Sequence, residues 1–246
     1  MQTPMHINQS DFHDQLVRGL THKMNNILSL FHGYLGLLMD DKNLDASTLA
    51  GLGRIKDGAL AATELMDRTK ALARPSSIVW REVNLADLFE SMRPSFEEIA
   101  GPSVNLQIDV PSNLPTVWAD IARLKMAITE IVSNACEASG SGGLVKIDVQ
   151  SAESQLSPNV NGPAKVTQPI TWVSINVTDY GSGIAPELTE KIFHPFFTTK
   201  QDKESVGLGL PVALGLIQQF GGAIRFKSKP GLTTFRLLMP SRSSRM

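Results

Sequence analysis

The apolar residues of the first third of the chain recur at intervals of three and four positions. Between about Asp11 and Met39 this spacing predicts a long amphipathic helix. Its apolar stripe consists of Phe12, Leu16, Leu20, Met24, Ile27, Phe31, Tyr34, Leu35 and Leu38. A polar interruption, in which Asp45 or Ser47 could cap the next helix, precedes a second periodic run that ends at Leu72. The two runs predict an antiparallel helical hairpin over residues 10–75.

A hairpin alone cannot cover an apolar stripe on each of its two helices. The simplest way to bury both stripes is to pair two hairpins as a four-helix bundle. The sequence therefore predicts a homodimer.

The pattern changes after Arg74-Pro-Ser-Ser, which has the composition of a linker. Helical spacing or helix-start signals then predict helices at 86–100, 120–139, 186–192 and 207–220. Apolar runs or alternation predict strands at 81–85, 104–110, 144–150, 172–178, 223–227 and 233–239. Ser151–Pro169 and Thr198–Val206 have no period and are interpreted as a long hairpin loop and a mobile lid. The second domain, residues 80–241, is thus expected to mix helices and strands.

Composition excludes several classes of protein. The chain has 246 residues, 42% of them hydrophobic, which is ample for one large or two smaller domains. A formal net charge of −1 argues against a general nucleic-acid binder, which normally shows a basic excess. The single cysteine, Cys136, excludes an intramolecular disulfide and a cysteine-based zinc cluster, and its apolar surroundings indicate a small core residue.

No segment predicts membrane insertion or secretion. The longest apolar stretch, from Ile27 to Met39, is short of the ~18 residues that a membrane span needs and contains His32. The amino terminus lacks a cationic region followed by an apolar core, so no signal peptide is expected. We therefore expect a soluble, cytoplasmic protein without a membrane span.

Asp179-Tyr-Gly-Ser-Gly-Ile follows an apolar, β-rich run and is the first candidate for binding chemistry. Two glycines two positions apart let the backbone approach a ligand closely, because they have no Cβ and tolerate positive φ. The aspartate offers a charged acceptor to an exocyclic amine such as that of adenine, and such a bond contributes about 1.5–3 kcal/mol. The same pattern also marks ordinary turns after strands.

Glu130 and Asn134 are four positions apart on the predicted helix 120–139 and therefore share one face. Asn134 could give a neutral oxygen to Mg²⁺, which prefers oxygen ligands and is usually held by few protein groups plus phosphates. Glu130 could orient a water or accept a proton. The alternative is that both are polar residues on a solvated helix face.

Two later segments add to these candidates. Phe193-His-Pro-Phe-Phe-Thr-Thr-Lys is unusually aromatic for a loop, and its rings could anchor a lid beside an adenine ring or simply fill the core. Gly207-Leu-Gly-Leu-Pro opens a helix, and amides at a helix amino terminus behind glycines form a natural phosphate cradle. No P-loop motif occurs, and Gly181-Ser-Gly-Ile-Ala-Pro lacks the third glycine of a dinucleotide fingerprint, so neither a P-loop nor a Rossmann site is expected.

His22 lies two positions from both Leu20 and Met24, so at about 100° per residue it points away from the apolar stripe. Asn26 follows one turn later on the same face. The helix therefore presents a histidine and an asparagine on an exposed surface, where an imidazole could act as a nucleophile. Taken alone, the position equally suits a solvated surface histidine.

In this order and spacing, the segments resemble the conserved boxes of the histidine kinase and gyrase-type ATPase superfamily. Glu130-Ile-Val-Ser-Asn-Ala-Cys-Glu-Ala resembles the N box, and Asp179-Tyr-Gly-Ser-Gly-Ile the G1 box. The aromatic segment from Phe193 resembles the F box, and Gly207-Leu-Gly-Leu the G2 box. Leu20-Thr-His-Lys-Met-Asn-Asn-Ile-Leu is similar to the H box of two-component histidine kinases that read His-Asp-Phe-Asn-Asn-Leu-Leu. The resemblance covers about Asp11 to Pro240.

The resemblance implies an α+β protein: a helical hairpin that forms a dimeric four-helix bundle, then an α/β sandwich of the Bergerat type that binds ATP. Asn134 would hold Mg²⁺, and Asp179 would accept from the adenine amine. The three loops would supply the other nucleotide contacts, namely Gly181, Gly183, Ile184, Phe193, Phe197, Thr199, Lys200, Gly207, Leu208, Gly209 and Leu210. His22 would receive the γ-phosphoryl group and pass it to an aspartate on the receiver domain of a response regulator.

Lys23 departs from the family pattern, in which an acidic residue follows the histidine. A lysine charge ~6 Å away costs a developing imidazolium only ~0.7 kcal/mol in a water-like medium. Losing a positioned general base costs more, about 10²–10⁴ in rate. The change therefore predicts that His22 autophosphorylates slowly or needs a carboxylate from a partner. Asn26 matches the position linked in the family to dephosphorylation of the regulator.

Two other functions stay open at this point. Lys23 favours an ATP-binding scaffold or response-regulator phosphatase with weak autokinase activity. An ATPase clamp like gyrase or a chaperone is disfavoured by the hairpin and by the lack of a transducer domain. Because only about ten polar residues precede the hairpin, input is expected from a separate sensor protein, a ligand on this core or the dimer interface.

Overall fold

The computed structural model describes residues 9–72, 78–152, 171–199 and 206–242, with side chains for residues 16–71, 78–152, 171–199 and 206–241. The chain forms two compact units, Met1–Pro75 and Ser76–Met246. Three predicted segments lie outside the described residues: the whole linker at residues 74–77, the loop beyond residue 152 and most of the lid.

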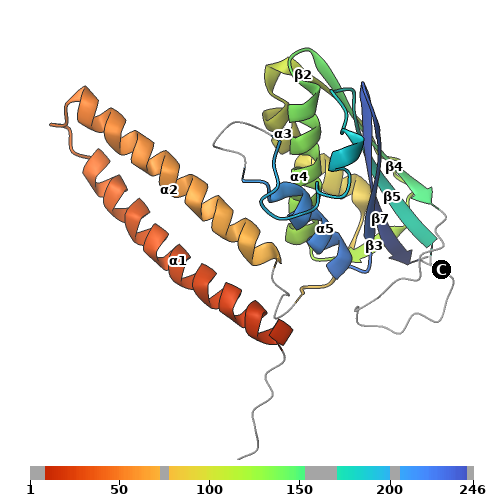
Figure 1. Ribbon diagram of the computed structural model, residues 1–246, viewed down its shortest axis with the longest axis horizontal. Helices are drawn as coiled ribbons and strands as arrows, with labels where there is room; N and C mark the ends of the chain where they lie inside the picture. The colour runs from red at the N-terminus through yellow and green to blue at the C-terminus, as the bar shows by residue number, and fades with distance from the viewer. Residues whose placement is uncertain (1–8, 73–77, 153–170, 200–205, 243–246) are drawn as a thin grey trace, which may run out of the picture. The chain divides into compact units, whose positions relative to one another are not determined.

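The first unit is a hairpin of two helices, α1 (Gln9–Met39) and α2 (Ala46–Leu72), as the apolar spacing predicts (Figure 1). Asp45 caps α2, because its Oδ1 accepts hydrogen bonds from the backbone amides of Ser47 and Thr48, each at 2.9 Å. The apolar cluster between the helices consists of Leu28, Leu35, Leu52, Ala59, Ala62 and Met66. The predicted hairpin is therefore confirmed.

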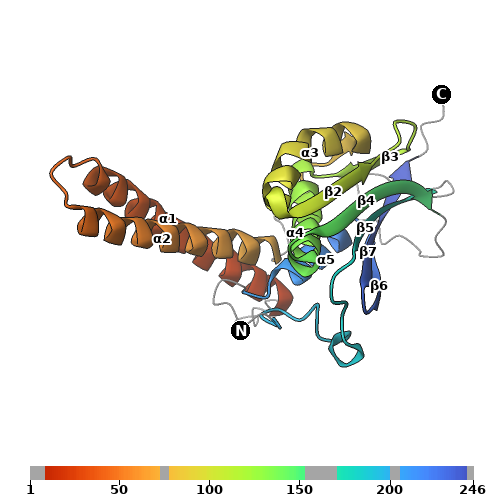
Figure 2. The ribbon, with the colours of Figure 1, turned by 90° about the horizontal axis from the view of Figure 1, so that it is seen from above.

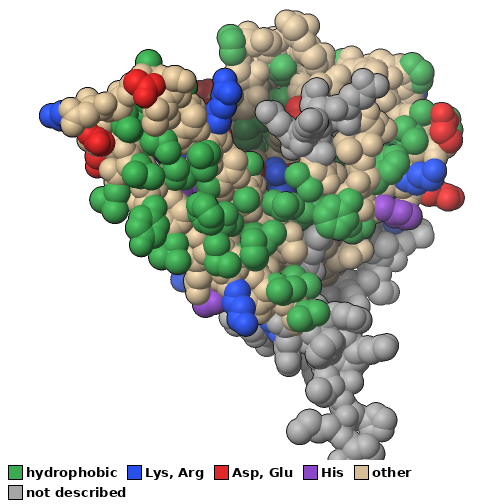
Figure 3. Space-filling model, turned by 60° about the vertical axis from the view of Figure 1, so that its left-hand side comes forward, with side chains coloured by type: hydrophobic (Ala, Val, Ile, Leu, Met, Phe, Trp, Pro, Cys, Tyr) green, Lys and Arg blue, Asp and Glu red, His purple; other side chains and the backbone are tan. Residues whose placement is uncertain are grey.

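The predicted stripe of α1 is not the face that packs against α2. Among its described members only Leu35 is buried, and the exposed members are Leu16, Leu20, Met24, Ile27, Phe31, Tyr34 and Leu38. The buried positions of α1 are Thr21, Leu28 and Leu35, seven residues apart, which is the spacing of a seam between two coiled helices. Figure 3 shows the remaining apolar side chains gathered on the outside of the hairpin. An exposed apolar surface of this kind marks an interaction site in a soluble protein.

The second unit is an α/β sandwich with a seven-stranded sheet. Its helices are α3 (Leu85–Ala100), α4 (Ile121–Ser139) and α5 (Gly209–Gln219). Its strands are β1 (Arg81–Val83), β2 (Val104–Asp109), β3 (Thr116–Ala119), β4 (Gly143–Ala152), β5 (Thr171–Asp179), β6 (Ala223–Lys229) and β7 (Leu232–Arg242). The strand order is β1-β3-β7-β5-β4-β2, with β6 also paired to β7. All three helices lie on one face of the sheet (Figure 2), and the predicted α+β class is confirmed.

Two local predictions were wrong and one strand was not predicted, each for an identifiable reason. The predicted strand 81–85 ends at Val83 because Asn84 caps α3, accepting a hydrogen bond from the Ala86 amide at 2.9 Å. β3 was not predicted, since its four residues are too few to show a period. The predicted helix 186–192 is only a short 3₁₀ turn, Pro186–Leu188, because so short a segment cannot repay the cost of helix nucleation.

β5 is enclosed on both edges and on both faces. All nine of its residues pair with β7, and eight of them pair with β4. Val173, Ile175 and Val177 face the helices and are fully buried. Trp172 and Ser174 point to the opposite face and are buried as well. The strand thus gives Asp179, its last residue, a fixed position at the end of the sheet.

Among the described helices, none combines the length and the hydropathy that crossing a bilayer demands.

Candidate active site

Helix α4 supplies one wall of the candidate site. Asp120 caps it by accepting hydrogen bonds from the amides of Ala122 at 3.1 Å and Arg123 at 3.3 Å. Glu130 is 8% exposed and Asn134 is half-buried, and the two share one helix face as predicted. A carboxylate is seldom buried in an apolar core, so the burial of Glu130 beside Asn134 indicates a functional surface on α4.

The turn after β5 lies against the last turn of α4. The carboxylate of Asp179 is 2% exposed, and its Oδ1 accepts a hydrogen bond from the Gly181 amide at 3.0 Å. A Cβ on Gly181 would come within 2.1 Å of the carbonyl oxygen of Ala138. Only glycine allows this approach, and Ala138 is one turn beyond Asn134. The turn that follows Asp179 therefore lies beside α4, one helical turn beyond Asn134.

Burial raises the pKa of the Asp179 carboxyl, and the hydrogen bond from the Gly181 amide opposes that rise. A carboxylate with one backbone donor and little access to water keeps unused acceptor capacity. It is therefore suited to accept a hydrogen bond from a ligand that enters the site.

Gly183 anchors the next part of this turn to the β6–β7 hairpin. Its φ is +79°, and a Cβ there would lie 2.5 Å from the carbonyl oxygen of Lys229. The following residue, Ile184, donates its amide to Ser228 Oγ at 2.8 Å, and that hydroxyl is 2.9 Å from Thr233 Oγ1. These contacts fix the loop that carries the two glycines.

The start of α5 lies against the polar face of α4. A Cβ on Gly209 would be 2.7 Å from Glu130 Oε2 and 3.3 Å from Asn134 Nδ2. The first backbone amides of α5 therefore lie next to these two side chains. Unpaired amides at a helix amino terminus favour the binding of anions. Leu208 is 2% exposed, so its side chain belongs to the core, and Leu210 is half-buried.

The aromatic segment is tied to the start of α5 through Gly207. The Phe196 amide donates to the carbonyl of Gly207 at 2.9 Å, and Gly207 has a φ of +70°. Phe193 packs against Phe226, with ring centroids 6.0 Å apart, and Phe226 stacks on Phe235. Phe193 is itself only partly buried, and through these rings it anchors the segment on the β6–β7 hairpin.

Phe196 is a feature that sequence reasoning missed. It has a φ of +65°, which strains any residue other than glycine, and its side chain is 68% exposed. The sequence shows three phenylalanines here but does not reveal which of them faces outward. Phe197 is half-buried, Thr199 is exposed, and Lys200 lies outside the described residues.

His22 and Asn26 belong to the hairpin unit. Both are exposed on α1, one turn apart, and Lys23 beside them is exposed too. Exposure leaves the imidazole of His22 accessible as a nucleophile.

No group of three or more His, Cys, Asp or Glu side chains within the described residues could form a metal site by itself. A metal at Asn134 would need most of its ligands from a bound molecule and from water, which is the usual situation for Mg²⁺ on phosphates.

Comparison with known proteins finds several to which this chain is similar. Residues 119–243 match the family described as histidine kinase-, DNA gyrase B-, and HSP90-like ATPases. The chain is 28% identical to the sensor kinase CckA of Brucella abortus over 92% of this chain and 24% of that protein. It is 30% identical to the sensory histidine kinase/phosphatase NtrB of Vibrio alginolyticus, over 92% of this chain and 61% of that protein. The chain thus spans less than two thirds of the length of these curated relatives.

A solved structure has the same fold. The full-length ShkA in complex with AMPPNP superposes with a TM-score of 0.68 and 20% sequence identity. The superposition covers 94% of this chain and 47% of that one.

We expect Gly183→Ala to destabilise the sandwich more than Gly231→Ala. The two glycines have nearly the same φ, +79° and +81°, so both variants carry similar backbone strain. A Cβ at 231 meets nothing within 4 Å, whereas one at 183 meets the Lys229 carbonyl. The clash should add about 1–3 kcal/mol to the loss of unfolding free energy, measured by urea denaturation. Equal losses in the two variants would contradict the close contact.

We expect Asp179→Asn to raise the stability of the ligand-free protein at neutral pH. Since burial raises the pKa of Asp179 above its ordinary 3.8, ionisation of this carboxyl opposes folding. The contribution of this carboxyl to the free energy of unfolding is fully present below pH 3.8 and is lost as the pH rises through the folded-state pKa. Asparagine keeps an oxygen for the Gly181 amide and does not ionise.

Urea unfolding of both proteins between about pH 3 and pH 8 measures this effect. The stability gap between variant and wild type should widen as the pH rises. Asp109→Asn, at the exposed end of β2, is the control for loss of a carboxylate. A gap for Asp179→Asn that matches the control at every pH would contradict the role of burial.

Proposed function

The chain belongs to the family of histidine kinase-, DNA gyrase B- and HSP90-like ATPases, and we propose that it is a two-component histidine kinase that phosphorylates His22 from ATP. Membership of the family confirms the resemblance seen in the sequence boxes. The observation that carries the proposal is the convergence on α4 of the Asp179 turn and the Gly209 helix start.

In this proposal, the adenine amine donates to the buried carboxylate of Asp179. Gly181 and Gly183 keep the floor of the pocket free of side chains, since a Cβ at either would strike backbone. Ile184, Phe193, Phe197 and Thr199 would line or cover the base and the sugar, and the same role is proposed for Lys200, which lies outside the described residues. The phosphates lie at the start of α5, where Gly207, Leu208, Gly209 and Leu210 present backbone rather than side chains.

Asn134 would hold Mg²⁺ through its amide oxygen, and bound Mg²⁺ would neutralise charge on the phosphates. The donor set fits this ion, because α4 offers an amide oxygen and, one turn away, the carboxylate of Glu130. Glu130 then orients a water or accepts a proton at its carboxylate.

The phosphoryl acceptor in this proposal is a ring nitrogen of His22. A P–N bond forms there as the bond between the γ-phosphorus and the oxygen of ADP breaks, and the imidazole gives its N–H proton to solvent water. The phosphoryl group then passes to an aspartate of a response-regulator receiver domain. A separate sensor protein, a ligand or the dimer interface would control the reaction.

The exposed surface of α1 supports the homodimer within this proposal. Leu30, Phe31, Tyr34 and Leu37 are each more than half exposed in the single chain. Burying four such side chains against a second copy stabilises by roughly 1.5–3 kcal/mol each before the costs of association. The hairpins of two chains would thus form a four-helix bundle.

A second candidate function is supported by Lys23, which replaces the acidic residue of the family pattern. In this alternative the protein binds ATP but acts mainly as a scaffold or as a phosphatase of a receiver domain, with Asn26 positioning the attacking water. The Vibrio relative carries both activities in its name.

Incubation with γ-labelled ATP and Mg²⁺ should give an acid-labile, alkali-stable phosphoprotein, and His22→Gln should abolish the label. His32→Gln is the matched control, because His32 is on the same helix but contacts Thr63 Oγ1 at 3.3 Å and is half-buried. Asp179→Asn should lose the label together with nucleotide binding measured by calorimetry.

Label that persists in His22→Gln would refute the assignment of His22. Rapid ATP hydrolysis without any phosphoprotein would instead point to an ATPase clamp.

Lys23→Glu should raise the rate of self-phosphorylation by roughly 10²-fold if the missing carboxylate limits the wild type. Lys23→Gln separates the loss of a positive charge from the gain of a base, and should change the rate far less. A wild type that is as fast as Lys23→Glu would leave the scaffold or phosphatase alternative without support.

A further inference from the structure

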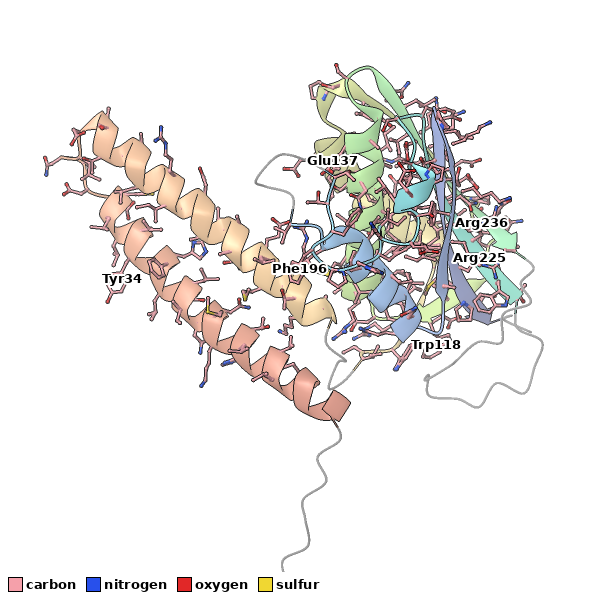
Figure 4. The ribbon with its side chains drawn as sticks, viewed as in Figure 1. Tyr34, Trp118, Glu137, Phe196, Arg225 and Arg236 are labelled. Atoms are coloured by element: carbon pink, nitrogen blue, oxygen red, sulfur yellow. The ribbon has the colours of Figure 1, made fainter. Side chains whose placement is uncertain are left out.

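The face of the sheet opposite the helices carries a row of polar side chains across four strands. The strand register places Asp148 of β4 opposite Asn176 of β5, Asn176 opposite Arg236 of β7, and Arg236 opposite Arg225 of β6. Figure 4 shows both arginines on the side of the sheet away from the helices. None of these residues takes part in the site described above.

A buried network holds Arg236 in place. Its Nε donates to Asn176 Oδ1 at 2.9 Å, and Asn176 Nδ2 donates to Asp148 Oδ2 at 2.7 Å. Ser174 Oγ donates to the same Asn176 oxygen at 2.8 Å. Asn176 is 3% exposed and Ser174 is fully buried, so neutral groups inside the sheet hold the guanidinium of Arg236 in position. A satisfied polar network of this kind specifies one orientation of the side chain.

The two arginines border a cationic groove of about 570 Å³. It is lined by Arg225, Phe226, Lys227, Ser228, Lys229, Leu232, Thr234 and Arg236. Four of these eight residues are cationic and none is acidic, although the whole chain has a net charge of −1. Among the described residues, none of the four cations forms an ion pair. The groove therefore concentrates unpaired positive charge.

Folding alone gives no reason for this arrangement. Like charges directly opposite each other on paired strands destabilise a sheet, and Arg225 is directly opposite Arg236. An anion between the two guanidinium groups would convert the repulsion into charge-assisted hydrogen bonds.

The spacing of the cations indicates the shape of that anion. Arg225, Lys227 and Lys229 alternate along β6, so their side chains leave the same face about 7 Å apart. Among the described strands, β6 pairs only with β7, which leaves its other edge open. An extended polypeptide with a carboxylate at every second residue has the same repeat, whereas a single phosphate would meet only part of this row.

We propose that the β6–β7 groove is a docking surface for an extended acidic segment of a partner protein. Carboxylates at alternate positions pair with Arg225, Lys227 and Lys229, and Arg236 contributes a second guanidinium opposite the first. Docking on this surface does not depend on phosphorylation of His22 or on nucleotide binding at Asp179.

The test uses the full chain and a fluorescein-labelled synthetic peptide in which Glu alternates with Thr. Anisotropy should detect binding that weakens as salt is added, and a peptide with Gln in place of Glu should bind roughly tenfold more weakly or less. Arg225→Gln and Arg236→Gln should each lose roughly tenfold in affinity. Unchanged thermal unfolding and nucleotide binding would establish that the variants are folded.

Arg81→Gln is the matched control, since Arg81 is an exposed arginine on the edge strand β1 of the same sheet. It should leave the peptide affinity unchanged. An equal loss in Arg81→Gln, or equal binding of the Glu and Gln peptides, would overturn the proposal. Displacement of the peptide by inorganic phosphate at an equal concentration would also overturn it and would identify a site for free anions.

Discussion

The candidate site depends on two places where backbone touches α4 with no Cβ in between. Gly181 meets the carbonyl of Ala138, and Gly209 meets the side chains of Glu130 and Asn134. Positions 130, 134 and 138 are about one turn apart, so α4 holds the two contacts roughly 6–12 Å apart along its axis. The cap at Asp120 and the buried side of α4 fix the helix against the sheet. A molecule that reaches both contacts must therefore lie extended along α4.

The buried carboxylate of Asp179 shows how the site conflicts with the stability of the fold. Its burial disfavours the charged form, and a neutral residue at the end of β5 would suit the sheet better. A residue that opposes folding at neutral pH, in a strand that is otherwise apolar toward the helices, is expected where binding requires it. The glycines around Asp179 also favour binding at the cost of stability, because a residue without a side chain makes no packing contacts but leaves space for a ligand.

Much of the fold follows from the sequence, because long periodic segments and caps leave few alternatives. The helices at 11–39 and 120–139 and the strand at 172–178 are as predicted, within a few residues at each end. The face of α1 that meets α2 was not evident from the sequence, since Thr21 is polar and Leu28 is no more apolar than the leucines that are exposed. β3 and the strained Phe196 depend on long-range contacts that leave no local pattern. Predicting the cationic groove would have required the register of β6 on β7, which hydrophobic spacing does not specify.

The enclosure of β5 has a consequence for the mobility of the residue at its end. Every residue of this strand is hydrogen-bonded into a ladder with β7, and nearly all are in a second ladder with β4. Amides of a strand that is paired on both edges exchange their hydrogens only in openings whose free energy approaches that of unfolding the domain. Asp179, the last residue of β5, is therefore expected to keep its position on the timescale on which the domain stays folded.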